Sequence, residues 1–468
     1  MINKKLATYI LNLSLETGAD FAEIYEEETI DKNVRVVNGL VENAASSISY
    51  GVGLRLLNGL KSVYGYTNDS SKKGLEKLAL SLRGAFSEER KIPEIKELTI
   101  EKVKNFYNKC TSLLTISTDD IVSLLKNVNK EILSYDNRIV KSTASFSISK
   151  TTSHIFNSNS KIFNNTKEYG RLGLLSIASQ NGKMEMRFDG PGSQSGWEFF
   201  TKTLDLNNLI KEHSSKLILM LEAKECPSGK FPVVIGNGWG GVIFHEACGH
   251  QLEASAVGKN MSVFSGMLNK QIANTCVTAY DDGTIPNEWG SNLIDDEGHP
   301  TQKNLLIENG ILKGYLIDDF TGRRMNMKGN GACRRESYKY EPTSRMSNTY
   351  IAPGKYTPEE IIANTKLGIY AKSFNGGSVD PTTGDFNFGC SEAYIIKDGK
   401  ITTPVRGATL VGNAKDILKH IDMVGNDLAL GQGMCGAASG SIPVDVGQPT
   451  IRVDEISVGG RGGDIHEY

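Results

Sequence analysis

The chain has 468 residues, of which 39% are hydrophobic and 23% are charged, so it is an ordinary globular sequence that is too long for one compact core. Its 52 Lys and Arg residues nearly balance 54 Asp and Glu residues, and the net charge of −2 argues against a protein whose main task is direct binding of nucleic acid. No apolar run approaches the roughly 18 residues of a membrane-spanning helix, so we expect no membrane association.

The targeting and redox features favour the cytoplasm. Residues 1–25 begin with two lysines, but Thr8, Asn12 and Ser14 interrupt the apolar stretch and no small-residue cleavage site follows. They therefore predict an amphipathic first helix and not a signal peptide. The seven cysteines are odd in number, scattered and without a CxxC pair. Such usage argues against a disulfide framework and favours a reducing, cytoplasmic location.

Helix and strand signals alternate within residues 1–105. Two strand-like pairs turn at Asn38-Gly39 and at Asn58-Gly59, which predicts hairpins, because these residues accept positive φ. Apolar residues at helical spacing then mark residues 70–86 as a helix.

Residues 118–136 predict a further helix, with Thr118 or Asp119 as its N-cap, and residues 204–223 predict a long amphipathic helix. Between them, residues 138–188 change to a period of two, which is typical of an antiparallel meander. One face of its first strand is expected to carry Val140, Ser142, Ala144, Phe146 and Ile148.

A domain boundary is predicted where Pro227, Ser228 and Gly229 interrupt the pattern. We therefore expect residues 1–226 to form the N-terminal α+β part, including the meander at 138–188, and residues 227–468 to form a C-terminal domain. The predicted fold class is α+β, with two domains and mostly antiparallel or mixed sheets.

The second half opens with a predicted strand at 231–236, a glycine-rich turn and a predicted helix at 241–255. Hairpins are expected at Asn309-Gly310 and Asp398-Gly399. A short helix after Tyr356 has an unusually complete start, since the sequence offers a cap, a first-turn proline and a capping-box glutamate, namely Thr357, Pro358 and Glu360.

The stretch HEACGH carries the strongest chemical signal. His245 and His250 offer the nitrogen ligands that zinc favours, and Glu246 could deprotonate a water held by such a metal. Five residues apart, the two histidines diverge by about 140° on a regular α-helix, so one ion could take both only if the helix is widened or ends between them. We therefore predict a π-type bulge or irregular turn at residues 247–250, where Gly249 permits the distortion.

A catalytic zinc needs a third protein ligand, and the sequence leaves several open. The chemically suitable residues are His299, Asp295, Asp296, Cys248 and Cys435. Cys435 has some appeal because the glycines of GQGMCG would allow close approach to a metal, although a small buried thiol is the plainer interpretation. The alternative is that His245 and His250 are simply two buried histidines packed near a glycine-rich turn, which the pattern favours less.

The glycine-rich turn also suggests an alternative function. Gly236, Gly238 and Gly241 form a GxGxxG between a predicted strand and a predicted helix, as in a dinucleotide site of an oxidoreductase. No acidic residue ends a second strand about 20 residues later, since Glu253 falls within the same helical stretch. The glycines are better explained by tight docking of the turn, which places His245 at the site.

The sequence resembles the TldD/PmbA family of metallopeptidases, and its TldD branch in particular. The resemblance runs through most of the chain and is densest from about residue 231 to residue 460. The matching stretches are HEACGHQLEAS, SVFSG, DDGT, IDDEGHP, LIENGILKGYL, RRESY, SRMSNTY, GIYA, GGSVDPTTGDFNF, SEAYIIKDGKITTPV, GATL, MVGNDL, GMCG and PVDVGQPTIRVDEISVGG.

The resemblance implies that His245, His250 and Cys435 bind zinc in the C-terminal half and that Glu246 is the catalytic glutamate. It implies a zinc-dependent peptidase that hydrolyses unfolded peptides or peptide precursors with a water activated by zinc and Glu246. It also implies a dimer, formed with a second copy or with an inactive PmbA-like sibling. A catalytically inactive peptide-binding or regulatory subunit of the same family is the main alternative.

Four further residues have plausible supporting roles. Glu253 could orient the ring of His250, although a solvated or capping carboxylate is as good an interpretation. Arg334, Arg335 and Tyr338 could bind a substrate carboxylate or an oxyanion, but a structural ion-pair role is favoured for them.

Overall fold

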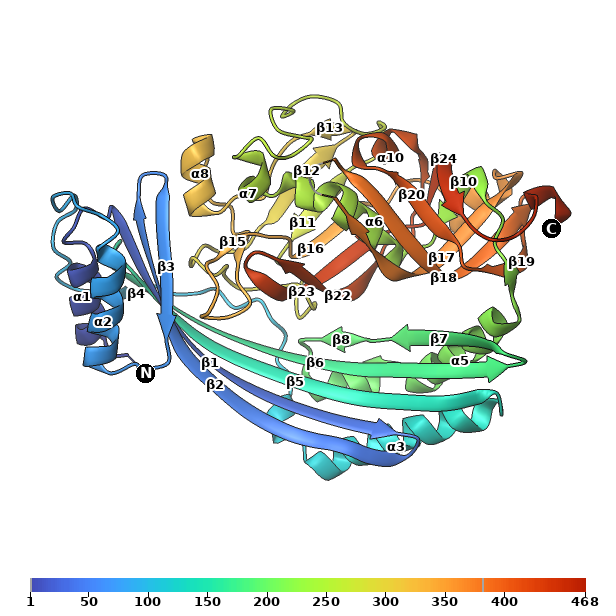
Figure 1. Ribbon diagram of the computed structural model, residues 1–468, viewed down its shortest axis with the longest axis horizontal. Helices are drawn as coiled ribbons and strands as arrows, with labels where there is room; N and C mark the ends of the chain where they lie inside the picture. The colour runs from blue at the N-terminus through green and yellow to red at the C-terminus, as the bar shows by residue number, and fades with distance from the viewer. Residues whose placement is uncertain (1, 381–382) are drawn as a thin grey trace.

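The computed structural model describes residues 2–380 and 383–468 and arranges them in two bodies (Figure 1). We call residues 2–222 the N-terminal body and residues 224–468 the C-terminal body. Residues 381 and 382 of the stretch GGSVDPTTGDFNF lie outside the described residues. No helix in the described ranges is long and apolar enough to cross a membrane. All seven cysteines are free.

The N-terminal body is a long, curved eight-stranded sheet in the order β3-β2-β1-β5-β6-β4, with β7 and β8 also paired to β6. Its pairings are antiparallel except for β4 with β6. The strands are β1 (Phe21–Val37), β2 (Leu40–Asn58), β3 (Lys61–Thr67), β4 (Thr99–Ile100), β5 (Ile139–Asn157), β6 (Lys161–Gln180), β7 (Lys183–Asp189) and β8 (Gly192–Ser193). The helices are α1 (Lys4–Ser14), α2 (Lys72–Arg83), α3 (Thr118–Tyr135), α4 (Gly196–Glu198) and α5 (Leu206–Glu222).

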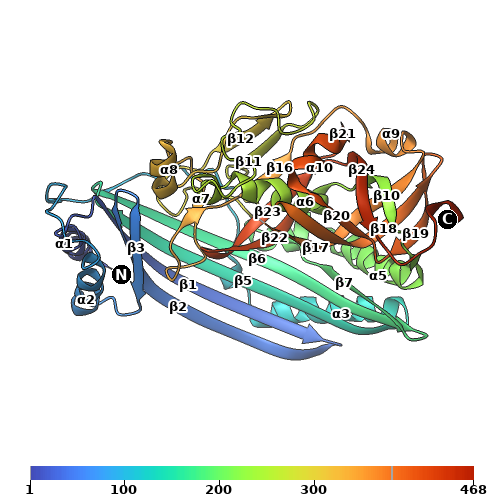
Figure 2. The same cartoon turned by 45° about the horizontal axis from the view of Figure 1, so that its top comes forward.

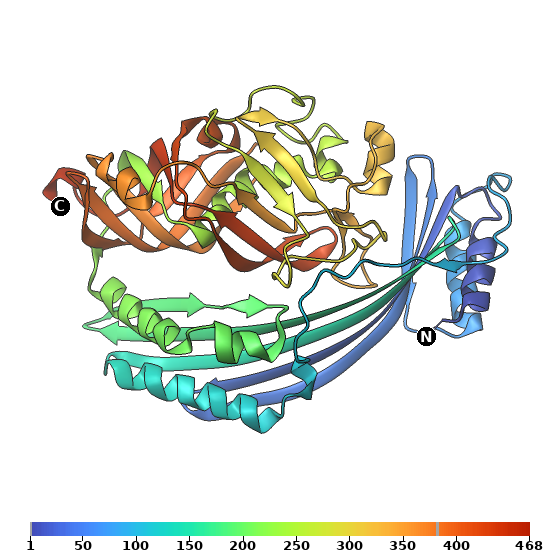
Figure 3. The same cartoon turned by 180° about the vertical axis from the view of Figure 1, so that it is seen from behind.

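Helices cover this sheet at two places. Helices α3 and α5 pack side by side on one face, and α3 lies on the side away from the C-terminal body (Figures 1 and 3). Helices α1 and α2 pack together at the end of the sheet farthest from the C-terminus (Figure 2). The face under α3 and α5 is apolar, with Phe146, Leu172 and Leu174 fully or almost fully buried.

The C-terminal body contains an eight-stranded sheet in the order β17-β10-β24-β20-β18-β19-β9, with β21 on β24, and a six-stranded sheet in the order β13-β12-β11-β16-β23-β22. The first strands are β9 (Lys224–Glu225), β10 (Gly229–Ile235), β11 (Ala279–Asp282), β12 (Lys303–Glu308), β13 (Ile311–Leu312), β14 (Cys333–Arg334), β15 (Thr343–Ser344) and β16 (Asn348–Ile351). The remaining strands are β17 (Leu367–Val379), β18 (Asp385–Lys397), β19 (Lys400–Arg406), β20 (Thr409–Asn413), β21 (Ile421–Val424), β22 (Ala429–Ala437), β23 (Gly440–Gln448) and β24 (Ile451–Gly459). The helices are α6 (Val242–Phe244), α7 (Ala254–Val257), α8 (Asp319–Met325), α9 (Pro358–Ala363) and α10 (Ala414–His420).

The predicted fold class is confirmed, because helices cover mostly antiparallel or mixed sheets in both bodies. The division at residues 226 and 227 stays a prediction. Strand β9 precedes that point and already pairs with β19 of the C-terminal body, so the sheets separate at about residue 223.

Several local predictions are confirmed. Asn38-Gly39, Asn309-Gly310 and Asp398-Gly399 turn with positive φ at both residues, as two-residue hairpins of this type require. Helix α9 begins with a complete capping box, in which Thr357 and Glu360 bond each other's backbone N–H.

Three local predictions are wrong in instructive ways. The hairpin after β2 turns at residues 59 and 60, because Asn58 still belongs to the strand and Gly59 takes the positive φ of 58°. Helix α3 is capped by Ser117, whose side chain accepts from Asp120 N, and not by Thr118 or Asp119. Val140 does not share the buried face of β5 but is 54% exposed. A register shift between residues 139 and 141 places Ile139 in the core instead.

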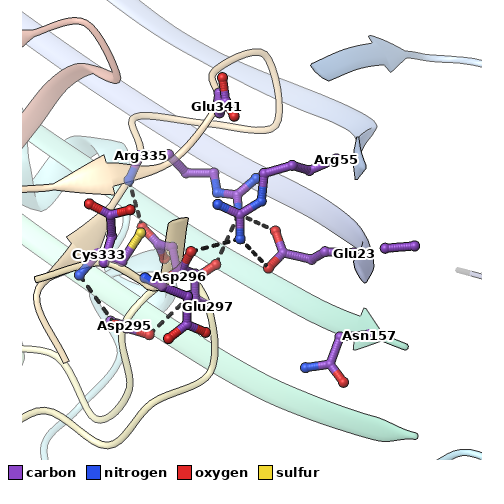
Figure 4. A network of polar contacts seen from close by, with 12 residues as sticks. Glu23, Arg55, Asn157, Asp295, Asp296, Glu297, Cys333, Arg335 and Glu341 are labelled. Atoms are coloured by element: carbon purple, nitrogen blue, oxygen red, sulfur yellow. Dashed lines mark hydrogen bonds and ion pairs between the residues drawn. The ribbon is translucent and has the colours of Figure 1, made fainter. Parts of the chain in front are cut away.

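A buried ion-pair network joins the two bodies (Figure 4). Arg55 Nη2 on β2 lies 3.1 Å from Glu23 Oε2 on β1 and 2.7 Å from Glu297 Oε1 of the C-terminal body. In the opposite direction, Arg335 Nη2 of the C-terminal body lies 2.6 Å from Glu23 Oε1. Lys167 Nζ on β6 lies 3.2 Å from Asp296 Oδ1. The side chains of Arg55, Glu23 and Arg335 are completely buried, so each charge depends on its partners for compensation.

Arg55→Met should lower the free energy of unfolding by about 3–5 kcal/mol, because it leaves Glu23 and Glu297 without a buried cation that both contact. Urea unfolding of the purified chain measures this. Arg35→Met is the matched control, since Arg35 pairs with Glu42 at the surface, and it should cost no more than about 1 kcal/mol. Equal losses for the two variants would contradict a dominant role for the network.

The β22–β23 hairpin is held by the loop that precedes β12. Trp289 Nε1 donates to Gly433 O at 2.8 Å, and Gly290 N donates to Asp445 Oδ2 at 3.2 Å. Asp445 is completely buried, and this burial, with the nearby charge of Glu288, raises the pKa of its carboxyl to about 8. The folded chain therefore keeps a proton on Asp445 that the unfolded chain loses.

This proton makes stability depend on pH. The contribution of Asp445 is complete below a pH of about 4, declines as pH rises and is lost above about 8, at no more than about 1.4 kcal/mol per pH unit. In Asp445→Asn the side chain stays neutral, so the free energy of unfolding should fall less steeply over this interval than in the parent chain. Urea titrations at several pH values measure the difference; parallel curves would contradict it.

Candidate metal centre

The HEACGH stretch lies on an irregular turn after β10. A 3₁₀ turn (Gly238–Gly241) leads into the single turn of α6, then a π-helical turn (His245–Gly249) and a second 3₁₀ turn (His250–Leu252). Glu253 is already extended, so the predicted continuous helix over 241–255 is wrong. The predicted π-type distortion is confirmed and begins at His245, two residues earlier than expected.

Glycines allow this turn to pack against backbone. A Cβ on Gly236 would lie 2.5 Å from Lys372 O on β17, and one on Gly241 would lie 2.5 Å from the backbone of Gly447 on β23. These contacts account for the GxGxxG pattern by close packing, without a nucleotide. Gly249 likewise leaves room for Met346, whose Sδ would be 2.1 Å from an added Cβ.

The widened turn brings both imidazoles to one side chain of the six-stranded sheet. Cys435 Sγ on β22 lies 3.3 Å from His245 Nε2 and 3.2 Å from His250 Nε2. The two rings are nearly perpendicular, with centroids 5.1 Å apart. His245 and Cys435 are 2% and 5% exposed, so the three groups meet in a mostly buried position.

This geometry fits a zinc ion. With Zn–S near 2.3 Å and Zn–N near 2.0–2.1 Å, a tetrahedral angle puts sulfur and nitrogen about 3.5 Å apart, close to the spacing of these atoms. Two imidazoles and one thiolate also leave a fourth position open, as catalytic zinc sites do.

The electrostatic setting favours a thiolate. Burial opposes ionisation of Cys435, but the charge of His245 and hydrogen bonds with His245 and His250 outweigh it and lower the pKa of the thiol to about 3. Burial likewise opposes protonation of His250, but Glu253 and Cys435 raise the pKa of the ring well above its usual range. The negative charges of Cys435 and Glu253 and the positive charge of the His250 ring thus compensate one another.

Two glutamates flank His250 on opposite ring nitrogens. Glu253 Oε1 lies 3.2 Å from Nδ1, where it can orient the ring. Glu246 Oε2 lies 3.8 Å from Nε2, the nitrogen that faces Cys435, and its side chain is 24% exposed. Glu246 therefore reaches both the cluster and solvent, as a proton acceptor for a bound water must.

The other proposed ligands lie elsewhere. Cys248 is completely buried in the apolar core of the C-terminal body. The carboxylates of Asp295 and Asp296 accept hydrogen bonds from the backbone N–H groups of Cys333 and Arg335, respectively, within the network of Figure 4. His299 Nε2 lies 2.8 Å from Asp319 Oδ2.

His299 and Asp319 form a second possible ligand group with Glu297, but this group is poorly suited to binding a metal ion. Asp319 N donates to one oxygen of Glu297, and the guanidinium of Arg55 lies 2.7 Å from the other. Both oxygens of Glu297 are therefore already engaged, one of them by a positive charge.

The RRESY residues Arg334, Arg335 and Tyr338 make structural contacts and also line a cleft between the two bodies. Arg334 Nη1 donates to Met346 O at 2.8 Å, and Arg335 belongs to the network between the bodies. Tyr338 Oη accepts from Asn68 Nδ2 at 2.7 Å. The residue that sequence reasoning missed is Arg345, which contacts both the Cys435 hairpin and Glu253; it lies in the matching stretch SRMSNTY, the one signal that could have drawn attention to it.

Two imidazoles, a thiolate and an adjacent carboxylate are the functional groups of a metallopeptidase centre. Residues 22–85, 111–221 and 228–460 match, respectively, domain 1, the central domain and the C-terminal domain of the PmbA/TldA metallopeptidases. The chain belongs to this PmbA/TldD family.

Curated relatives agree with the assignment. A protein of Buchnera aphidicola from Schizaphis graminum, named a metalloprotease TldD homolog, is 37% identical over 94% of this chain and 93% of its own length. A Haemophilus influenzae protein of the same name is 35% identical over 96% of this chain and 95% of its own length.

Solved structures share the fold. A Thermotoga maritima protein described as a candidate modulator of a DNA gyrase matches with a TM-score of 0.77 at 21% identity, over 97% of this chain and 99% of that one. TldE from Thermococcus kodakarensis matches with a TM-score of 0.77 at 18% identity, over 97% of this chain and 99% of its own.

Gly249→Ala should destabilise the folded chain by about 1–3 kcal/mol and weaken metal binding, because the added methyl overlaps Met346 and pushes the π-helical turn. Adding Met346→Ala should restore part of the loss, giving a coupling free energy of about 0.5–3 kcal/mol in a double-mutant cycle. Gly389→Ala is the control, since an added Cβ there meets nothing within 4 Å. A neutral Gly249→Ala would contradict the tight packing.

Proposed function

We propose that the protein is a zinc-dependent peptidase that hydrolyses unfolded peptides or peptide precursors. The observation that carries the proposal is the meeting of His245 Nε2, His250 Nε2 and Cys435 Sγ, with sulfur–nitrogen distances of 3.3 and 3.2 Å, beside the carboxylate of Glu246. The complete donor set favours an active enzyme over a binding or regulatory subunit. Family membership supports the same chemistry.

The residues divide the reaction between them. His245, His250 and Cys435 hold the metal, and the thiolate cancels one of its two charges. Zinc, when bound, supplies a Lewis acid that polarises the peptide carbonyl and acidifies water. Glu246 accepts the proton of the attacking water and passes it to the leaving amine. Glu253 holds the ring of His250 through Nδ1.

An extended peptide fits the surroundings better than a folded protein does. Strand β22, which carries Cys435, is an edge strand of the six-stranded sheet, so a peptide could pair along it as an added strand. The other face of the hairpin, at Met434 and Pro443, borders a cleft of about 540 Å³ between the two bodies, where Tyr25, Tyr169 and Trp289 offer aromatic contacts. Alternate side chains of such a peptide would point toward the cleft and toward the metal centre.

We further propose that the enzyme works in the cytoplasm as a dimer, with a second copy or with a PmbA-like sibling that lacks the metal ligands. The free cysteines support the location. The similarity to a chain named TldE supports a sibling as partner.

Glu246→Gln should retain zinc and lose peptidase activity by about 10²- to 10⁴-fold, because the amide keeps the shape of the side chain but cannot accept the proton. Cleavage of an unstructured fluorogenic peptide, measured beside zinc content by elemental analysis, tests this. Glu308→Gln, at the partner of the surface residue Lys313, is the control and should behave as the parent chain. Undiminished cleavage by zinc-loaded Glu246→Gln would sink the proposed role.

A further inference from the structure

Arg345 is a buried arginine in the link between β15 and β16, with an exposed fraction of 1%. Its guanidinium donates to three acceptors of the β22–β23 hairpin: Nη2 to Cys435 O at 2.5 Å, and Nη1 to Ser439 Oγ and Gly440 O, both at 2.9 Å. The planar fork of arginine thus holds both the strand that carries Cys435 and the turn that follows it.

The same guanidinium faces the histidine side of the centre. Arg345 Nε lies 3.9 Å from Glu253 Oε1, and that oxygen lies 3.2 Å from His250 Nδ1. Glu253 is 5% exposed, so water compensates little of its charge and Arg345 is its cationic neighbour. One side chain therefore connects His250 and Cys435, which are 185 residues apart in the sequence.

We propose that Arg345 is a positioning residue for the metal centre: it fixes the Cys435 strand through backbone and turn contacts, and it keeps Glu253 oriented toward His250. This rests on the proposed function only in so far as the cluster binds zinc. Arg345 itself donates hydrogen bonds to the hairpin only, and its Nε faces Glu253 at an ion-pair distance of 3.9 Å. Its removal would free the turn at residues 439 and 440 and take a permanent positive charge away from the buried carboxylate of Glu253, so both ligands would lose their alignment.

Arginine should be needed here, and not merely a positive charge. Lysine could compensate Glu253 but could not donate at once to Cys435 O, Ser439 Oγ and Gly440 O, because its single ammonium lacks the fork geometry. Arg345→Lys is therefore the central variant. Arg334→Lys is the matched control, since Arg334 is also buried and donates to backbone but contacts none of the three ligands.

The test measures metal binding on the full chain, independently of catalysis. Zinc affinity is determined by competition with a chelator, and cobalt is substituted so that the thiolate-to-metal charge-transfer band and the d–d bands report the ligand arrangement. Arg345→Lys should bind zinc about tenfold to 100-fold more weakly and show a reduced charge-transfer band, while Arg334→Lys keeps both. Unfolding of the metal-free forms verifies that each variant is folded.

Two smaller variants test the two halves of the arrangement and decide the question if Arg345→Lys does not fold. Ser439→Ala removes one hairpin contact, and Glu253→Gln removes the charge next to His250; both should weaken zinc binding. Parent-like affinity and cobalt spectra in Arg345→Lys, or in both smaller variants, would overturn the proposal. A parent chain that binds zinc but cleaves no peptide refutes the peptidase and leaves this test intact, whereas one that binds neither zinc nor cobalt overturns both.

Discussion

The β22–β23 hairpin must stay in place against the turn after β10, because the candidate centre takes Cys435 from one and both histidines from the other. Contacts from separate segments hold it there. Gly241 approaches the backbone of Gly447, and Trp289 donates to Gly433 O. Arg345 donates to the carbonyl of Cys435 itself. Sulfur and nitrogen that must share one ion tolerate little displacement, so the chemistry of the site depends on this backbone packing.

A second constraint acts between the two bodies. Buried ion pairs such as Arg55 with Glu23 and Glu297 contribute little net stability relative to apolar packing, but they fix one relative arrangement, since any other leaves charges uncompensated. The cleft between the bodies takes Tyr25 from the N-terminal sheet and Met434 from the hairpin. Lys167 and Arg335 of the network also line this cleft, so its shape depends on the ion pairs in Figure 4.

The sequence predicted those features of the site that depend on local geometry. Five-residue spacing of His245 and His250 is incompatible with a shared ion on a regular helix, and this alone required the distorted turn that the structure contains. The third ligand could not be chosen in the same way, because no local pattern tells which distant segment returns to the turn. Five side chains had suitable chemistry, and the family resemblance selected Cys435.

The errors in the fold have a similar origin. The hairpins at Asn38-Gly39, Asn309-Gly310 and Asp398-Gly399 were predictable because two residues determine their φ angles. The pair Asn58-Gly59 misplaced its turn by one residue, and the bulge that exposes Val140 leaves the period-two pattern of β5 unchanged on either side. The family models divide the N-terminal body into two domains, whereas the sequence analysis treated it as one part. The strands of both domains belong to one continuous sheet, so no change in composition marks a boundary between them. Arg345 was missed because its partners come from two segments that are distant from it in the sequence, the β22–β23 hairpin and Glu253.

Proximity of reactive groups does not by itself make a catalytic site, as another cluster in this protein demonstrates. His213 Nδ1 lies 2.6 Å from Asp189 Oδ2, and its Nε2 lies 2.9 Å from Ser176 Oγ, which is the connectivity of a serine hydrolase triad. Ser176 and His213 are both completely buried, and together they tie α5 to the sheet. At the candidate metal centre, by contrast, Glu246 reaches solvent and the donor atoms of three residues lie within 4.8 Å of one another. Access and convergence together, more than residue identity, separate the candidate active site from a structural hydrogen-bond chain.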